Sequence, residues 1–258
     1  MRIFIYNFLH GFTMQKIIVT GFPHSGTTIL KNIIGHIPDV KEIVHEEKLI
    51  RDYDEDPTYA WNMCKWPFAR EEFFGDEYAE YTKIFILRNP LWIFSSLNKR
   101  CAHDTPPGIP PNHDVEVYIE ICERYLHLLN NPRKKVHLLK YESIFDDNFA
   151  ELRRTFDTIG FHYDADIFQN ERFRNFSHRN ITEIPSDPVP NVDHERYRTW
   201  QINQPIHNMN DINKLELLPH QVERILRSPV IMRLYPEIPL VLTLANIPYD
   251  PAIVARAR

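Results

Sequence analysis

Residues 16–40, KIIVTGFPHSGTTILKNIIGHIPDV, constrain the fold of this chain more than any other segment. The run KIIVT at 16–20 is mostly apolar and β-branched and ends at Gly21, which is typical of a buried parallel strand. After the loop, apolar side chains recur at helical spacing between residues 27 and 36. A strand, a glycine loop and a helix in this order predict the first unit of an α/β domain.

The alternation of strands and helices continues along the chain. Further strands are expected at residues 40–45, 83–88 and 135–141, and helices at 91–100, 115–129, 143–159 and 215–226. The acidic, aromatic stretch 52–80 is expected to be helical in pieces, and residues 162–210 show little periodicity. This order predicts an α/β, P-loop NTPase-like three-layer fold, in which helices cover both faces of a mainly parallel central sheet.

Composition and charge limit the domain organisation and the function. We expect one α/β domain at residues 16–258, preceded by an N-terminal extension at 1–15. The formal charge of −5 argues against nucleic acid as a partner, so any anion site must be a local basic pocket. No apolar run reaches the about 20 residues of a membrane span. The histidines and the three cysteines show no metal-ligand spacing. A cytoplasmic protein is expected.

The loop GFPHSGTT at residues 21–28 has the chemistry of an anion site. Backbone N–H groups of a glycine loop and the N-terminus of the following helix form a nest for anions, and Ser25, Thr27 and Thr28 add hydroxyl donors. The frame is that of a Walker A phosphate loop, but the lysine that should follow Gly26 is absent. That absence disfavours a kinase using Mg-ATP, because this lysine reaches the β- and γ-phosphates. The alternative is that the glycines only make a tight turn.

A second candidate anion site lies in RNPLWIFSS at residues 88–96. Arg88 ends a predicted strand, where open α/β sheets bind ligands, and Ser96 follows about two helical turns into the next helix. Arginine offers a planar fork for phosphate, and serine offers one hydroxyl. Alone, this spacing also fits an arginine in a surface ion pair.

Together, the two motifs resemble those of the PAPS-dependent sulfotransferases. GFPHSGTT is similar to the loop that binds the 5′-phosphosulfate of PAPS (3′-phosphoadenosine 5′-phosphosulfate), and RNPLWIFSS is similar to the 3′-phosphate motif. VHLLKYESIFDD is close to a strand of the family that ends in Tyr-Glu-Asp-Leu. The resemblance covers residues 16–160. It implies that the chain transfers a sulfonate group from PAPS to an acceptor hydroxyl or amine and releases PAP, and that no metal is required.

The resemblance also assigns roles to individual residues. Those expected to hold the donor are Pro23, His24, Ser25, Gly26, Thr27 and Thr28 at the 5′-phosphosulfate, Arg88 and Ser96 at the 3′-phosphate, Tyr141 near the adenine, and Arg196 and Arg198 over the nucleotide. Lys65 is expected as a second cation near the transferred sulfonate. The alternatives are a packed strand-end aromatic for Tyr141, a solvated side chain for Lys65 and a surface cluster for the two late arginines.

Two positions depart from the family pattern. His24 stands where relatives have lysine or arginine, and two nearby phosphates would favour the charged form of its imidazole. Pro67 stands where cytosolic relatives have a catalytic histidine, so another base is needed. The run PDVKEIVHEEKL is more similar to the tyrosylprotein, carbohydrate and bacterial branches, which implies Glu46 as general base, with Glu47 and His45 as alternatives. A solvated acidic helix start is the other interpretation of this run.

Two further functions stay open on the sequence alone. One is an atypical P-loop kinase that phosphorylates a small molecule or nucleoside with Mg-ATP, and the other is a non-catalytic binder of PAPS or another nucleotide. The acceptor class is not specified by any motif and includes carbohydrates, small molecules and peptides. The proline-rich residues 101–114 and the irregular residues 162–210 are expected to shape its pocket.

Overall fold

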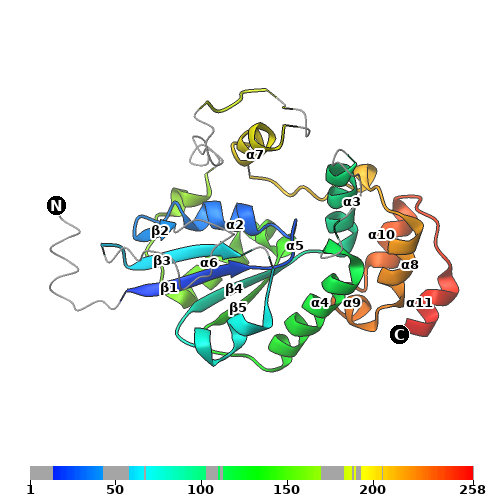
Figure 1. The fold of residues 1–258 in the computed structure, drawn as a ribbon, viewed down its shortest axis with the longest axis horizontal. Helices are drawn as coiled ribbons and strands as arrows, with labels where there is room; N and C mark the ends of the chain where they lie inside the picture. The colour runs from blue at the N-terminus through cyan, green and yellow to red at the C-terminus, as the bar shows by residue number, and fades with distance from the viewer. Residues whose placement is uncertain are drawn as a thin grey trace.

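The computed structural model describes residues 14–42, 58–66, 68–102, 110, 113–169, 183–187, 189, 193–204 and 206–257. Within this part of the chain, strands and helices alternate around one sheet (Figure 1). None of the described helices is both long and apolar enough to cross a bilayer. Residues 43–45 of the expected strand 40–45 lie outside the described residues. The base candidates His45, Glu46 and Glu47 lie outside them as well.

The central sheet consists of parallel strands in the order β2-β3-β1-β4-β5. The described strands are β1 (Gln15–Thr20), β2 (Val40–Glu42), β3 (Trp61–Trp66), β4 (Thr82–Leu87) and β5 (Val136–Lys140). Every neighbouring pair runs parallel. Because β1 lies between β3 and β4, the glycine loop that follows it opens at the centre of the carboxyl edge of the sheet. The predicted mainly parallel α/β fold is confirmed.

The helices follow the strands on both faces of the sheet. They are α2 (Thr27–Ile34), α3 (Pro90–Cys101), α4 (Val115–Asn130), α5 (Tyr141–Ile144), α6 (Ala150–Ile159), α7 (His194–Ile202), α8 (Pro219–Arg227), α9 (Pro229–Leu234), α10 (Ile238–Leu244) and α11 (Pro251–Ala257). Figure 1 shows α8 to α11 grouped with α3 and α4 at one end of the molecule.

Two apolar cores lie on opposite faces of the sheet, because successive side chains of a strand point in opposite directions. Ile17 and Val19 of β1 pack with side chains of α2 and α6, and Ile18 between them packs with side chains of α3, α4 and the C-terminal helices. All three are fully buried. The three-layer arrangement predicted from the sequence is therefore present, with β1 buried from both sides.

The main error of the sequence prediction concerns residues 52–80, which were expected to be helical in pieces. Residues 61–66, WNMCKW, instead form β3, which pairs with β1 on one side and β2 on the other. Asn62 and Lys65 interrupt the apolar run, so the segment has neither the continuous apolar pattern of a buried strand nor a clean alternation. The segment is a strand because it pairs with β1 and β2, and its local sequence pattern does not indicate this.

Two helix predictions and one prediction of irregular structure also differ from the structure. The helix expected at 143–159 is divided into α5 and α6, since Asp147, Asn148 and Phe149 between them have positive φ angles. The helix expected at 215–226 begins at Pro219, which can only occupy the first turn because it lacks an N–H group. Residues 162–210, expected to be irregular, contain α7.

Candidate functional site

The glycine loop folds tightly against β4 and β5. Gly26 has φ 96°, a left-handed conformation that favours glycine, and a Cβ at this position would lie 2.5 Å from the ring of Tyr141. A Cβ at Gly21 would lie 2.5 Å from the carbonyl oxygen of Ile86. Close packing therefore requires glycine at both positions, and at Gly26 the left-handed backbone conformation requires it as well. His24, between them, also has a positive φ of 67°.

The hydroxyl groups of the loop differ in their surroundings. Ser25 is fully buried, and its Oγ accepts a hydrogen bond from the backbone N–H of Phe22 at 3.2 Å. This bond closes the turn from within the loop. Thr28 is half-buried at the start of α2, where its Oγ1 accepts a hydrogen bond from Nζ of Lys65 at 3.1 Å. The structure thus brings Lys65, from the end of β3, to the predicted phosphosulfate loop.

The two candidate anion motifs meet through His24. Its Nδ1 atom lies 2.6 Å from Oγ of Ser96, a hydrogen bond between residues 72 positions apart. Ser96 belongs to α3, whose start is fixed by Pro90 in the first turn and by Asn89, whose side chain accepts a hydrogen bond from the N–H of Leu91 at 3.0 Å. The imidazole is therefore held between the loop after β1 and the helix after β4.

Arg88 connects the same two segments through the backbone. Its Nη1 donates to the carbonyl oxygen of His24 at 3.0 Å, and its Nε and Nη2 donate to Oδ1 of Asn210 at 2.9 and 2.6 Å. The side chain is buried, with the guanidinium 4.2 Å from the centre of the Tyr141 ring. Burial lowers the pKa of Arg88, and the neighbouring Tyr141 and Glu142 oppose this change. An arginine remains charged in such a site.

Tyr141 is 1% exposed and packs between Gly26 and Arg88. Its hydroxyl oxygen accepts a hydrogen bond from the N–H of Met209 at 3.1 Å. Burial raises the pKa of the phenol, so this hydroxyl is neutral. Such surroundings match the packed strand-end aromatic that was the alternative interpretation of this residue. Contact with an adenine remains a prediction.

Two residues that the sequence did not single out complete the surroundings of Arg88. Oε1 of Glu142 accepts hydrogen bonds from the N–H of Asn89 at 2.9 Å and from Nδ2 of Asn210 at 3.2 Å. Burial raises the pKa of Glu142, although these bonds and Arg88 favour its charged form. Glu142 directly follows Tyr141 and so lies within VHLLKYESIFDD, the segment that resembles a strand of the family. That resemblance gave no role to Glu142 itself. Asn210 lies in the stretch without periodicity, where no sequence signal marks it.

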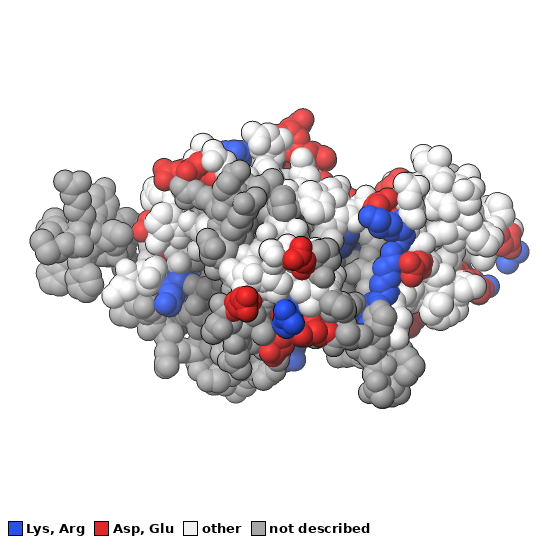
Figure 2. Space-filling view, turned by 90° about the horizontal axis from the view of Figure 1, so that it is seen from above, with Lys and Arg blue, Asp and Glu red and all other residues white. Residues whose placement is uncertain are grey.

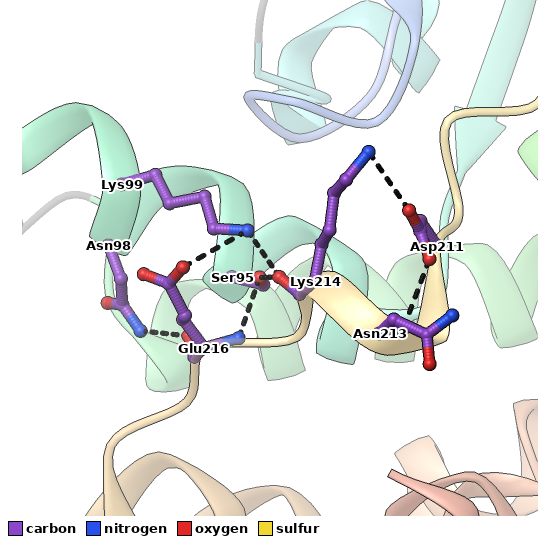
Figure 3. A network of polar contacts seen from close by, with 7 residues as sticks. All are labelled: Ser95, Asn98, Lys99, Asp211, Asn213, Lys214 and Glu216. Carbon is purple, nitrogen blue, oxygen red and sulfur yellow. Dashed lines mark hydrogen bonds and ion pairs between the residues drawn. The ribbon is translucent and has the colours of Figure 1, made fainter.

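Asn210 belongs to residues 206–218, a segment with a short 3-10 helix at Ile212–Lys214, which we call the strap. Figure 3 shows how the strap follows α3: the N–H of Glu216 donates to Oγ of Ser95 at 2.9 Å, Nδ2 of Asn98 donates to the carbonyl oxygen of Glu216 at 2.8 Å, and Lys99 pairs with the Glu216 carboxylate at 3.4 Å. Figure 2 shows basic side chains, with acidic ones beside them, crossing the upper face of the molecule.

The remaining predicted residues are not placed at this site by the described contacts. Glu46, Glu47, His45 and Pro67 lie outside the described residues, as does the side chain of Arg198. Arg196 is exposed on α7, where its Nε lies 3.9 Å from the carboxylate of Asp193 at the start of the same helix. Within the described ranges, no group of three or more His, Cys, Asp or Glu side chains could hold a metal ion.

Comparison with known proteins supports the fold assignment. No protein-family model matches the sequence, and no curated protein matches it. The structure is similar to that of the mouse sulfotransferase SULT7A1 complexed with PAP, with 14% sequence identity and a TM-score of 0.50, over 95% of this chain and 90% of that chain. A retinol dehydratase in a complex with retinol and PAP has 12% sequence identity and a TM-score of 0.39, over 67% of this chain and 71% of that chain. The likeness to SULT7A1 does not distinguish the branches, and what it establishes is that this chain has the sulfotransferase fold.

Proposed function

We propose that the chain is a PAPS-dependent sulfotransferase that moves a sulfonate group to an acceptor hydroxyl or amine. The observation that carries the proposal is the hydrogen bond between His24 and Ser96. It joins the candidate phosphosulfate loop to the candidate 3′-phosphate motif, in a chain with the sulfotransferase fold. A nucleotide with phosphates at both its 5′ and 3′ positions is the ligand that two such adjoining anion sites suit.

The residues present fit such a donor. Gly26 directly precedes α2, so an anion in the loop would meet the backbone N–H groups at the N-terminus of that helix. Thr27 and Thr28 add hydroxyl groups, and Pro23 and Ser25 would shape the loop from within, since the Ser25 hydroxyl already bonds Phe22. Arg88 and Ser96 would hold the 3′-phosphate.

The transfer itself requires charge stabilisation and a base. The acceptor oxygen or nitrogen forms a bond to sulfur while the bond from sulfur to the bridging phosphate oxygen breaks, which leaves negative charge on PAP. His24 would stabilise that charge, and Lys65, which contacts Thr28 of the loop, would assist it. Glu46 would accept the proton of the acceptor, as the resemblance to the carbohydrate and tyrosylprotein branches implies. No residue in this scheme calls for a metal.

Ligand-dependent thermal stability tests the proposal against its two rivals. A ligand present at 100 times its Kd stabilises a protein by about 2.7 kcal/mol. We expect PAP and PAPS to raise the melting temperature of the full chain, and ATP with Mg²⁺ or GTP to leave it nearly unchanged. A shift with Mg-ATP but none with PAP would instead identify a kinase. A shift with PAP but no sulfonate transfer to a broad panel of acceptors would identify a non-catalytic binder.

Substitution of Arg88 locates the ligand. In the variant Arg88→Gln the shift with PAP should fall by more than half. The matched control is Arg224→Gln, which removes an exposed arginine paired with Glu116 on the surface of α8. An equal PAP shift in wild type and Arg88→Gln would remove the 3′-phosphate role from Arg88.

A further inference from the structure

The hydrogen bonds of Arg88 leave a defined part of its guanidinium group unused. The group has five N–H donors. Two are directed at Oδ1 of Asn210, from Nε and Nη2, and one is directed at the carbonyl oxygen of His24, from Nη1. One N–H on each Nη atom is therefore left for a further acceptor, and Nη1 and Nη2 together make up the terminal edge of the guanidinium plane. This edge is one of the two through which arginine binds phosphate in a bidentate manner.

Asn210 has a fixed orientation because it lies between opposite partners. Its Oδ1 accepts from the guanidinium, and its Nδ2 donates to Oε1 of Glu142 at 3.2 Å. A reversed amide would place its NH₂ group against the donors of Arg88 and its oxygen against the carboxylate. Glu142 is in turn held by the N–H of Asn89 at 2.9 Å. The chain of contacts from Glu142 through Asn210 to Arg88 thus has one consistent direction.

The backbone that carries Asn210 is itself anchored on both sides. The N–H of Met209, the preceding residue, donates to the hydroxyl of Tyr141 at 3.1 Å. The N–H of Asn210 donates to Oδ1 of Asn208 at 3.0 Å, and further along the strap Glu216 bonds to Ser95 of α3. The side-chain amide of Asn210 therefore lies on a segment that is hydrogen-bonded both to Tyr141, just after β5, and to Ser95 of α3.

We propose that Asn210 is a positioning residue for the recognition of a 3′-phosphate. It holds one edge of the Arg88 guanidinium, together with the carbonyl oxygen of His24, and so keeps the terminal edge available to the phosphate. Glu142 keeps the Asn210 amide in the orientation that this requires. The inference rests on the proposed function, because it concerns the 3′-phosphate subsite of the same donor. It assigns to the strap a role in selecting nucleotides that carry a 3′-phosphate.

The test compares PAP with adenosine 5′-monophosphate, which lacks the 3′-phosphate. Their dissociation constants are measured by calorimetry with the full chain. The readout is the Kd of adenosine 5′-monophosphate divided by the Kd of PAP. In Asn210→Ala, Arg88 loses two of its three hydrogen bonds, and we expect binding of PAP to weaken by roughly tenfold or more, as for bonds to a charged group. Binding of adenosine 5′-monophosphate should change little. Asn213→Ala, on the same strap with an exposed side chain, should leave the ratio unchanged.

A second variant covers the case in which Asn210→Ala does not fold. Asn210→Asp has nearly the same shape, but its carboxylate pairs with Arg88 and competes with the phosphate, so the ratio should fall at least as far. An unchanged ratio in either folded variant would overturn the inference. The proposed function fails separately, if the wild-type chain does not bind PAP more tightly than adenosine 5′-monophosphate. A general loss of stability from a purely structural role would weaken both nucleotides alike and would also overturn the inference.

Discussion

Nδ1 of His24 lies 2.6 Å from Oγ of Ser96, although one residue follows β1 and the other lies in α3. The contact holds the imidazole between the loop after β1 and the helix after β4. We expect a side chain that bridges both candidate anion sites to respond to a ligand at either of them. The properties of His24 are therefore the most direct measure of what this loop does.

Substitution of His24 should affect turnover more than binding. We expect His24→Ala to lower kcat by about 100-fold, the scale for loss of one group that stabilises developing charge, with a smaller change in the Kd of PAP. His24→Lys should retain more activity than His24→Ala. Both variants place a Cβ-bearing residue at the same positive φ of 67°, so backbone strain does not distinguish them. Equal kcat in wild type and His24→Ala would show that the imidazole takes no part in the transfer.

The parts of the fold that the sequence predicts are those in which a local pattern and tertiary contacts agree. β1 and β4 are buried from both sides, and their nearly continuous apolar runs indicate this directly. The run WNMCKW of β3 carries Asn62 and Lys65, and its strand form depends on pairing with β1 and β2. No local pattern records that pairing, so the sequence prediction there was wrong.

The site shows the same division. The motifs predict which segments contribute, because a glycine loop and a strand-end arginine have local signatures. They do not predict that Arg88 contacts Asn210, which is 122 positions further along the chain. Asn210 lies in a segment without periodicity, so no local signature marks it. Long-range polar contacts of this kind depend on how the strap follows α3, and a single sequence does not encode them in any recognisable spacing.

Gly26 and Gly160 offer a matched pair for testing how closely the loop is packed. Both have positive φ, 96° and 89°, but a Cβ at Gly26 would lie 2.5 Å from the Tyr141 ring, whereas nothing lies within 4 Å at Gly160. Gly160→Ala should cost about 1 kcal/mol from backbone strain alone. Gly26→Ala adds a steric cost of about 1–3 kcal/mol.

Thermal or urea unfolding of the two variants measures this difference. We expect a decrease in Tm of about 2–4 °C for Gly160→Ala and clearly more for Gly26→Ala. PAP binding should weaken only in Gly26→Ala. Equal losses of stability in the two variants would show that the Tyr141 ring moves aside without cost.

Lys83 gives a pH-dependent prediction that is independent of ligand binding, since it lies near the start of β4, away from the glycine loop. It is 3% exposed, and its ammonium group donates to the carbonyl oxygen of Tyr78. Burial, followed by repulsion from Lys135 and Arg133, lowers its pKa to about 8, from 10.5. Because the unfolded chain binds the proton more tightly, this group destabilises the folded state below pH 8, and the penalty disappears as the pH rises towards 10.5.

Lys83→Met removes that penalty. At pH 7 the variant should have a higher free energy of unfolding than the wild type. Removal of the buried charge contributes at most about 3 kcal/mol, and loss of the hydrogen bond to Tyr78 takes away about 1 kcal/mol. The advantage should shrink between pH 8 and pH 10.5, as urea unfolding across this range measures. Lys134→Met, at an exposed position of the same chain, serves as the control, and its effect on the free energy of unfolding should not change over this pH range. A Lys83→Met advantage that grows with pH would contradict the assignment.

Substitution of Glu46 tests the removal of the acceptor proton, which makes the acceptor nucleophilic. Glu46→Gln keeps the size and polarity of the side chain but cannot accept a proton, so kcat should fall by about 10²–10⁴-fold, the range for general acid–base catalysis. The Kd of PAP should stay the same, because the base acts on the acceptor and not on the donor. Glu47→Gln is the matched control, one residue further along the same acidic run, and should retain activity. The reverse pattern would move the base to Glu47, and full activity in both variants would exclude this run from proton transfer.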